Sequence, residues 1–132
     1  YNATNLVLNL SNWDTSNVQD MSYLFYSVGF NSQTISFSGL EDWNTGNVTN
    51  MGCMFYNTGR NLDVFNIGDI GKWDVSKVKH MDEMFYKSKF NGDLRNWQID
   101  PRCSTMKLFD GSHMAEKNMP KYNKNYKGPW RS

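Results

Sequence analysis

The sequence has no run of about 18 apolar residues and no basic segment followed by an apolar stretch. We therefore expect no membrane insertion and no signal peptide within these 132 residues. Two cysteines are too few for a disulfide framework, and they say little about the redox compartment. The chain begins at Tyr1 rather than at Met, so we expect it to be a segment of a longer protein.

Motifs for catalysis and cofactor binding are also missing. The segment GDIG at residues 68–71 lacks the spacing and the Lys of a phosphate-binding loop. Cys53, Cys103, His80 and His113 show no Cys-x-x-Cys or His-x-x-x-His spacing. We therefore predict no cofactor, no metal and no catalytic residue. A hydrolase that uses His80 with a carboxylate is the weakest of the functions considered.

Basic side chains are nearly missing from the first half of the chain. Residues 1–71 hold one, Arg60, against six acidic ones, which gives a net charge of −5. Residues 72–132 hold 13 basic and 7 acidic side chains, which gives +6. Such asymmetry can favour head-to-tail contacts or a polyanionic partner at the basic end, but solvated charge without a partner is the commoner case.

What the sequence does contain is one motif written three times. NWDTSNVQDMSYLFY at residues 12–26 returns as DWNTGNVTNMGCMFY at 42–56 and as KWDVSKVKHMDEMFY at 72–86. A catalytic motif needs to occur only once, so the repetition indicates an architectural unit stacked on itself. The search for function therefore moves from a pocket to a surface.

The repeated residues predict stacked units of strand and helix. Trp13, Trp43, Trp73 and Trp97 mark the copies, and a Leu or Ile lies three positions before each. Apolar residues at offsets of five, eight, eleven and twelve after the Trp have the spacing of one face of a short helix. They are Val18, Met21, Leu24 and Phe25, then Val48, Met51, Met54 and Phe55, then Val78, Met81, Met84 and Phe85. The segment before each Trp predicts a short strand or extended arm.

We predict an α/β fold of about four rungs. The rungs lie at about residues 1–28, 29–58, 59–88 and 89–112. In the last rung, Arg102 and Thr105 stand where Val and Met stood before, which suits a capping repeat with a polar outer face. The basic segment 113–132 is predicted to be a C-terminal cap or a flexible tail, and its composition leaves both open.

WDTSNVQDMSYLF at residues 13–25, WDVSKVKHMDEMF at 73–85 and FNGDLRNW at 90–97 resemble the BspA-like leucine-rich-repeat family of bacterial surface proteins, whose repeat is about 25 residues long. The resemblance covers roughly residues 6–112. It implies a right-handed leucine-rich-repeat-like solenoid, a place at the cell surface or in the extracellular medium, and adhesion to host or neighbouring-cell partners. The family defines no catalytic residues. This chain departs from it in two longer units and in a Tyr where the family has a small residue.

That Tyr recurs at one offset, at Tyr26, Tyr56 and Tyr86, and Tyr23 adds a fourth ring near the first copy. Stacked copies would align these rings into a rigid, amphipathic surface of the kind found at binding interfaces. We predict these four tyrosines as ligand-binding residues. The alternative is that they only shield the edge of the core.

The C-terminal segment interleaves basic and aromatic residues. They are Lys117, Lys121, Lys124, Lys127 and Arg131 with Tyr122, Tyr126 and Trp130. This composition is found in nucleic-acid and glycan contacts. A soluble tail or end cap is the favoured explanation, and we expect no nucleic-acid partner.

The two cysteines are predicted to be free thiols. Cys53 and Cys103 occupy different columns two rungs apart. Stacking would separate them by at least about 9–10 Å, beyond the limit of about 7 Å for the Cα atoms of a disulfide.

These observations predict a non-enzymatic, surface-displayed repeat module that binds a protein or glycan of a host or neighbouring cell. A structural spacer or stalk segment of a larger surface protein is the main alternative.

Overall fold

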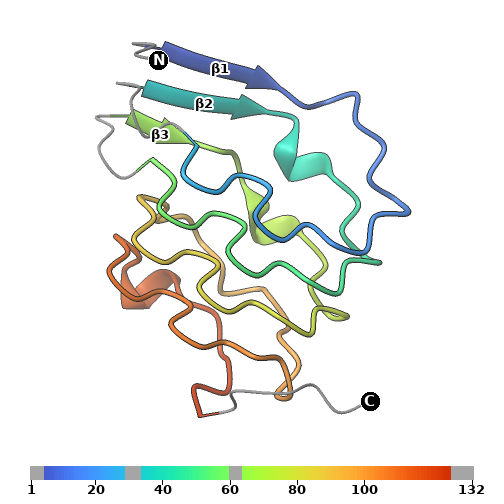
Figure 1. The fold of residues 1–132 in the computed structure, drawn as a ribbon, viewed down its shortest axis with the longest axis vertical. Coiled ribbons are helices and arrows are strands. Elements are labelled where there is room, and N and C mark those ends of the chain that lie inside the picture. Colours follow the sequence, from blue (N-terminus) through green and yellow to red (C-terminus); the bar gives the residue numbers. More distant parts are fainter. Residues whose placement is uncertain (1–4, 29–33, 60–63, 126–132) are drawn as a thin grey trace.

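The computed structural model describes residues 5–28, 34–59 and 64–125. Figure 1 shows the chain winding from one end of the molecule to the other, with β1 at one end and residues near 120 at the other. Segments about thirty residues apart in the sequence therefore lie side by side, and the hydrogen bonds and strand pairs confirm this.

Each of the first three copies begins with a strand of a parallel sheet. The strands are β1 Asn5–Asn9, β2 Thr34–Ser38 and β3 Val64–Asn66, in the order β1-β2-β3. Leu8 pairs with Phe37, and Ser36 pairs with Asn66. Phe37 and Ile67 are buried and Leu8 is half-buried against the core. The predicted extended arms are therefore present in these three copies.

The predicted helices are not formed, and the prediction of an α/β, leucine-rich-repeat-like solenoid with a helix in each rung is wrong. Within the described ranges the helical segments are three short 3-10 turns, η1 Leu40–Asp42, η2 Ile70–Lys72 and η3 Glu116–Asn118. The segment 48–55, which is predicted to be helical, instead has an isolated bridge at Asn50 followed by turns from residue 52 onward.

These turns are held by hydrogen bonds to the next copy. The N–H groups of Met51, Cys53 and Phe55 donate to the carbonyls of His80, Asp82 and Met84 at 2.8, 3.0 and 2.8 Å. Between them, Met54 and Tyr56 donate to the carbonyls three residues earlier, those of Met51 and Cys53, both at 3.2 Å. An α-helix would use the carbonyl four residues earlier in the same copy. The backbone therefore bonds between copies, as in a sheet, although its local path is a row of turns.

Left-handed residues at two fixed positions exclude a helix. Ten and fourteen residues after each Trp, the backbone φ is positive. Seven of these eight positions hold residues other than glycine with φ between 53° and 61°, and the eighth is Gly111 with φ 69°; the seven are Tyr23, Ser27, Cys53, Asn57, Glu83, Lys87 and Lys107. A positive φ at the third residue is what a type II turn requires, and it interrupts a right-handed helix. Such turns still bring residues three and four positions apart to one side, because Met51, Met54 and Phe55 are all fully buried. The apolar spacing therefore fits both structures.

The Leu-x-x-Trp spacing has a direct physical cause. The carbonyl of Leu40 accepts the backbone N–H of Trp43 at 3.2 Å and the indole N–H of Trp73, from the next copy, at 2.9 Å. The same indole contact joins Trp43 to Leu10 at 3.1 Å and Trp97 to Ile70 at 2.9 Å. One carbonyl thus closes a turn in its own copy and also binds the indole of the next copy.

Aromatic rings fill the interior as a continuous column. Phe25, Phe55, Phe85 and Phe109 stack with centroids 5.4–5.5 Å apart. Trp43 and Trp73 stack beside them at 6.5 Å with an interplanar angle of 4°. Burial of each such side chain is worth about 1.5–3 kcal/mol, so the repeated apolar residues hold the copies together.

The described part of the C-terminal segment packs against the last copy. The Tyr122 ring meets the Phe109 ring edge-on at 5.9 Å. The Thr105 hydroxyl donates to the Asn123 carbonyl at 3.1 Å, and Met114 is buried. Residues 113–125 therefore cover this end of the stack, whereas 126–132 lie outside the described residues.

Candidate functional site

The four tyrosines predicted as a binding column lie together and form a row of rings, here called the tyrosine ladder. Tyr26 stacks on Tyr56 with centroids 4.7 Å apart and an interplanar angle of 8°. Tyr56 stacks on Tyr86 at 4.9 Å and 23°. Tyr23 lies against Tyr26 at 5.7 Å, tilted by 43°. The ladder therefore runs across three successive copies.

The ladder lies at the surface. Tyr23 is 62% exposed and Tyr26 is 46% exposed, while Tyr56 and Tyr86 are half-buried. Because Tyr56 has a ring on each face, it presents mainly its ring edge to a partner. At the far end, the Lys87 ammonium lies 5.3 Å from the Tyr86 ring centroid, within cation–π range.

Backbone hydrogen bonds fix the spacing of the rings. Three of the ladder tyrosines close a turn by donating their backbone N–H to the carbonyl of the left-handed residue three positions earlier; the pairs are Tyr26 with Tyr23, Tyr56 with Cys53, and Tyr86 with Glu83, at 3.1–3.2 Å. The N–H of Ser27 donates to the Tyr56 carbonyl at 2.8 Å, which ties the first copy to the second. The rings are thus ordered before any partner binds.

Beside Tyr23 lies an open depression of about 380 Å³, here called the polar hollow. Its lining residues come from three successive copies and are Ser22, Tyr23, Asn50, Gly52, Cys53, His80, Asp82 and Glu83. From the sequence, His80 is considered only for metal binding and for the weakest functional candidate, a hydrolase, and this hollow is not predicted. Stacking places His80, Asp82 and Glu83 beside residues of the two preceding copies.

One carboxylate of the polar hollow has a structural role. Asp82 Oδ1 accepts the Ser104 hydroxyl at 2.6 Å and the Met106 N–H at 2.7 Å. Asp82 therefore joins the third copy to the fourth. His80 contributes a backbone bridge in the same place, pairing with Asn50 on one side and Ser104 on the other.

The thiols are poor nucleophiles. Burial raises the pKa of Cys53, an effect opposed by its interaction with Tyr23 and reinforced by the Glu83 and Asp82 charges. Burial also raises the pKa of Cys103, to about 12. Both cysteines are free and stay protonated near neutral pH. Cys103 is fully buried and, like His113, lies outside the polar hollow.

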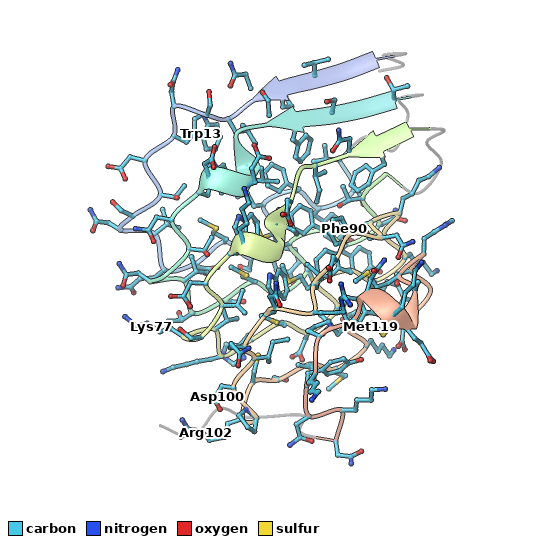
Figure 2. All side chains as sticks on the ribbon, turned by 180° about the vertical axis from the view of Figure 1, so that it is seen from behind. Trp13, Lys77, Phe90, Asp100, Arg102 and Met119 are labelled. Atoms are coloured by element: carbon cyan, nitrogen blue, oxygen red, sulfur yellow. The ribbon has the colours of Figure 1, made fainter. Side chains whose placement is uncertain are left out.

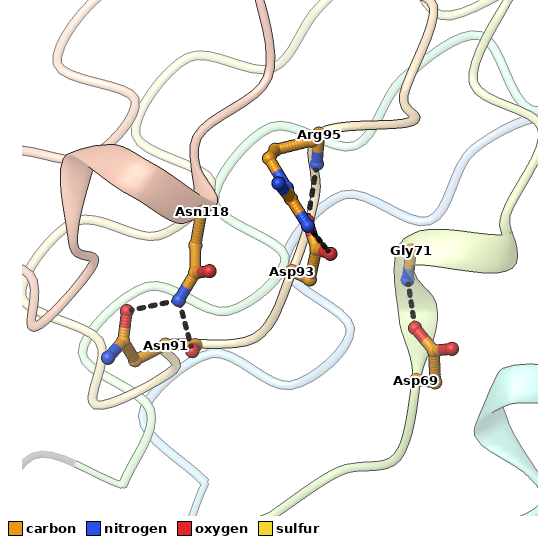
Figure 3. Close-up of polar contacts among 6 residues, drawn as sticks. All are labelled: Asp69, Gly71, Asn91, Asp93, Arg95 and Asn118. Carbon is orange, nitrogen blue, oxygen red and sulfur yellow. Dashed lines mark hydrogen bonds and ion pairs between the residues drawn. The ribbon is translucent and has the colours of Figure 1, made fainter.

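A second depression, of about 430 Å³, is lined by Asp69, Gly71, Lys72, Trp73, Asp93 and Asn96. Figure 3 shows that its carboxylates are already engaged. Asp69 accepts the Gly71 N–H at 3.2 Å, and Asp93 binds the Arg95 guanidinium at 2.9 Å. These hydrogen bonds from Arg95 lower the pKa of Asp93 to about 2. The two carboxylates therefore fix turns. Among the residues with described positions, no group of three or more His, Cys, Asp or Glu side chains could hold a metal ion.

The geometry defines a repeat protein whose successive copies stack, with the tyrosine ladder and the adjacent polar hollow on its surface. Residues 1–122 match the family described as "Mycoplasma protein of unknown function, DUF285", and the chain belongs to this family. No curated protein and no solved structure matches the chain. The resemblance to BspA-like proteins stays a prediction. In the three described ranges, no helix is long and apolar enough to cross a bilayer.

Proposed function

We propose that this protein is a non-enzymatic binding module, displayed at the cell surface or in the extracellular medium. Its tyrosine ladder contacts a protein or glycan of a host or neighbouring cell. The observation that carries the proposal is the stacking of Tyr26, Tyr56 and Tyr86 at 4.7–4.9 Å on the surface of three copies.

A ladder of this kind suits recognition because its side chains are already ordered. Tyrosine combines a large apolar ring with a hydroxyl that forms hydrogen bonds, and it is enriched at interfaces. Ordering a free side chain on binding costs about 0.5–1.5 kcal/mol. Stacked rings avoid much of this cost, so more of the contact energy remains as affinity.

The polar hollow adds groups that fix the orientation of a ligand. Ser22, Asn50 and His80 supply hydrogen-bonding groups next to the exposed Tyr23 ring. A few polar groups beside an aromatic surface set specificity in most ligand sites. The non-enzymatic part of the proposal is supported by the two protonated thiols and by the structural engagement of Asp82.

A structural spacer or stalk is the second candidate. The half-burial of Tyr56 and Tyr86 favours it, because these rings also cover the edge of the core. In that case the ladder would stabilise the stack and contact no partner.

A binding screen on purified protein separates the two. Glycan arrays and pull-downs from cell-surface extracts would compare the natural chain with a variant carrying Tyr26→Ser, Tyr56→Ser and Tyr86→Ser. The matched control carries Asn17→Ser, Asn47→Ser and Lys77→Ser, one exposed residue from each of the same copies in another column. We expect the tyrosine variant to lose the partner and the control to keep it.

Because Tyr56 and Tyr86 are half-buried, the single variant Tyr26→Ser guards against loss of folding. Equal binding by the natural chain and both tyrosine variants would eliminate the ladder as the contact. Failure of the natural chain to retain any protein or glycan would favour the spacer.

A further inference from the structure

The polar hollow holds hydrogen-bonding groups that no described residue engages. Asn50 Oδ1 accepts the Gly52 N–H at 2.9 Å, which leaves the Asn50 side-chain NH₂ group free to donate. Within the described part of the chain, the His80 imidazole and the Glu83 carboxylate also have no hydrogen-bond or ion-pair partner. All three side chains are half-buried. Since partly buried polar groups normally find partners, these three are available to a ligand.

The other polar groups around the hollow are used inside the protein. Asp82 Oδ1 is held by Ser104 and Met106, and the Ser22 hydroxyl donates to Asp20 Oδ1 at 2.6 Å. The free groups are therefore one donor, one acceptor, and one imidazole that can do both. A ligand that fills the hollow must both donate and accept hydrogen bonds.

Tyr23 supplies an aromatic wall beside these groups. Its hydroxyl interacts with the Cys53 thiol of the second copy, and this contact raises the pKa of Tyr23, together with burial and the Glu83 charge of the third copy. The Tyr23 ring is thus placed beside the hollow by residues that follow it in the chain. Its apolar surface meets any ligand that reaches the free polar groups.

The charge of the hollow is negative. No Lys or Arg among the described residues lines it, whereas Asp82 and Glu83 do. The Lys77 ammonium of the third copy lies 3.5 Å from Asn47 Oδ1, in another column, and Figure 2 shows Lys77 at the edge of the molecule. Lys107 follows Glu83 in its column, but the two form no salt bridge in the described structure. An anionic group would therefore be repelled.

The hydrogen-bonding pattern also disfavours a cationic side chain. A lysine or arginine only donates, so it would leave the Asn50 NH₂ group unpaired. The volume of the hollow, about 380 Å³, lies at the low end of the range of about 300–1,000 Å³ found for small-molecule sites. It suits one small, neutral unit.

We infer that the polar hollow seats one neutral sugar unit of a glycan. The C–H face of the sugar ring packs on the Tyr23 ring, and its hydroxyls bond to Asn50, His80 and Glu83. Each hydroxyl both donates and accepts, which matches the mixture of free groups. This site rests on the proposed binding function, because Tyr23 belongs to the tyrosine ladder, and it selects a glycan over a protein as the partner.

A glycan array probed with the natural chain tests the site. The neutral glycans contain only hexoses and N-acetylhexosamines, and their acidic counterparts add sialic acid or sulfate. We expect binding to neutral glycans, and binding about tenfold weaker to their acidic counterparts because of the two carboxylates. Isothermal titration calorimetry with a bound neutral glycan then gives its Kd.

Two variants locate the glycan. Asn50→Ala removes one hydrogen bond to the sugar and is expected to weaken binding about tenfold; Tyr23→Ser is expected to weaken it at least as much. The matched control is Asn44→Ala, because Asn44 Oδ1 accepts the Gly46 N–H at 3.0 Å in an equivalent turn outside the hollow. The control should keep the natural affinity. Circular dichroism and melting temperature confirm that each variant is folded.

The outcomes separate this site from the proposed function. A cell-surface protein retained through the tyrosine ladder, with no glycan bound on the array, would overturn the sugar site and leave the proposed function standing. Binding of acidic glycans alone would do the same. Equal affinity of Asn50→Ala and Asn44→Ala for a bound neutral glycan would place that glycan elsewhere and overturn the site. A natural chain that retains neither glycan nor protein would contradict both.

Discussion

The difference in stability between Glu83→Gly and Glu83→Ala distinguishes the row of turns from a helix, because the two structures predict opposite signs for it. Glu83 has a φ of 55°, donates to the Met106 carbonyl at 2.8 Å, and accepts the Tyr86 N–H at 3.2 Å. A left-handed residue other than Gly costs roughly 1–2 kcal/mol. Glycine avoids this cost but loses about 0.5–1 kcal/mol through its greater freedom in the unfolded chain.

We therefore expect Glu83→Gly to be as stable as the natural chain or up to about 1 kcal/mol more stable. Glu83→Ala keeps a Cβ at positive φ and should be about 1 kcal/mol less stable than the Gly variant. In a helix the order would reverse, because Ala is favoured over Gly by about 1 kcal/mol.

The assay is urea denaturation, and the free energies of unfolding are compared between variants that have the same m-value, the slope against urea concentration. Lys77, in the same copy, is exposed and has no positive φ, so it provides the control. There, Ala should be more stable than Gly. An Ala variant more stable than the Gly variant at position 83 would refute the turn structure.

Three further predictions follow from the contacts. Trp73→Phe removes the buried indole N–H that donates to the Leu40 carbonyl, and it should lower the free energy of unfolding measured in urea by about 1–3 kcal/mol. Trp13→Phe, at an exposed site, should lower it by less than about 0.5 kcal/mol. The buried Cys103 thiol should react with a thiol reagent only as fast as the protein unfolds. Because burial raises its pKa from 9.0 to about 12, the free energy of unfolding should fall as the pH rises above 9.0, and this fall should be smaller in Cys103→Ala. The pKa of Asp93 is lowered from 3.8 to about 2, so its contribution to stability is present above pH 3.8 and is lost as the pH falls through about 2. Asp93→Asn should therefore flatten that part of the acid unfolding profile. An unchanged profile would assign the acid sensitivity to other carboxylates.

The columns of the fold could be predicted from the sequence because they depend only on intervals along the chain. The spacing of thirty between Trp43 and Trp73, and between Tyr26 and Tyr56, predicts that equivalent residues meet when copies stack. The ring contacts at 6.5 and 4.7 Å agree with that prediction.

The path of the backbone between the columns could not be predicted in the same way. Intervals of three and four among apolar residues occur in a helix and in a row of type II and type I turns. The deciding residues are those with positive φ, such as Cys53 and Glu83, and neither is a residue type that favours this conformation. Cross-copy hydrogen bonds hold them there, and these act between residues about thirty positions apart.

The polar hollow was missed because its residues differ from copy to copy. One signal was present at seven residues after each Trp, where Asp20, Asn50, His80 and Ser104 are all polar and form a row of parallel bridges. A polar column next to the tyrosine column predicts a surface with both aromatic and hydrogen-bonding groups.

The central structural claim is that backbone N–H groups bond to the next copy rather than within a helix. Scalar coupling across hydrogen bonds, measured by NMR on labelled protein, identifies each acceptor directly. The account predicts coupling between the Phe55 amide nitrogen and the Met84 carbonyl carbon, whose oxygen lies 2.8 Å away. Coupling between Phe55 and the carbonyl of Met51, four residues earlier, would contradict it.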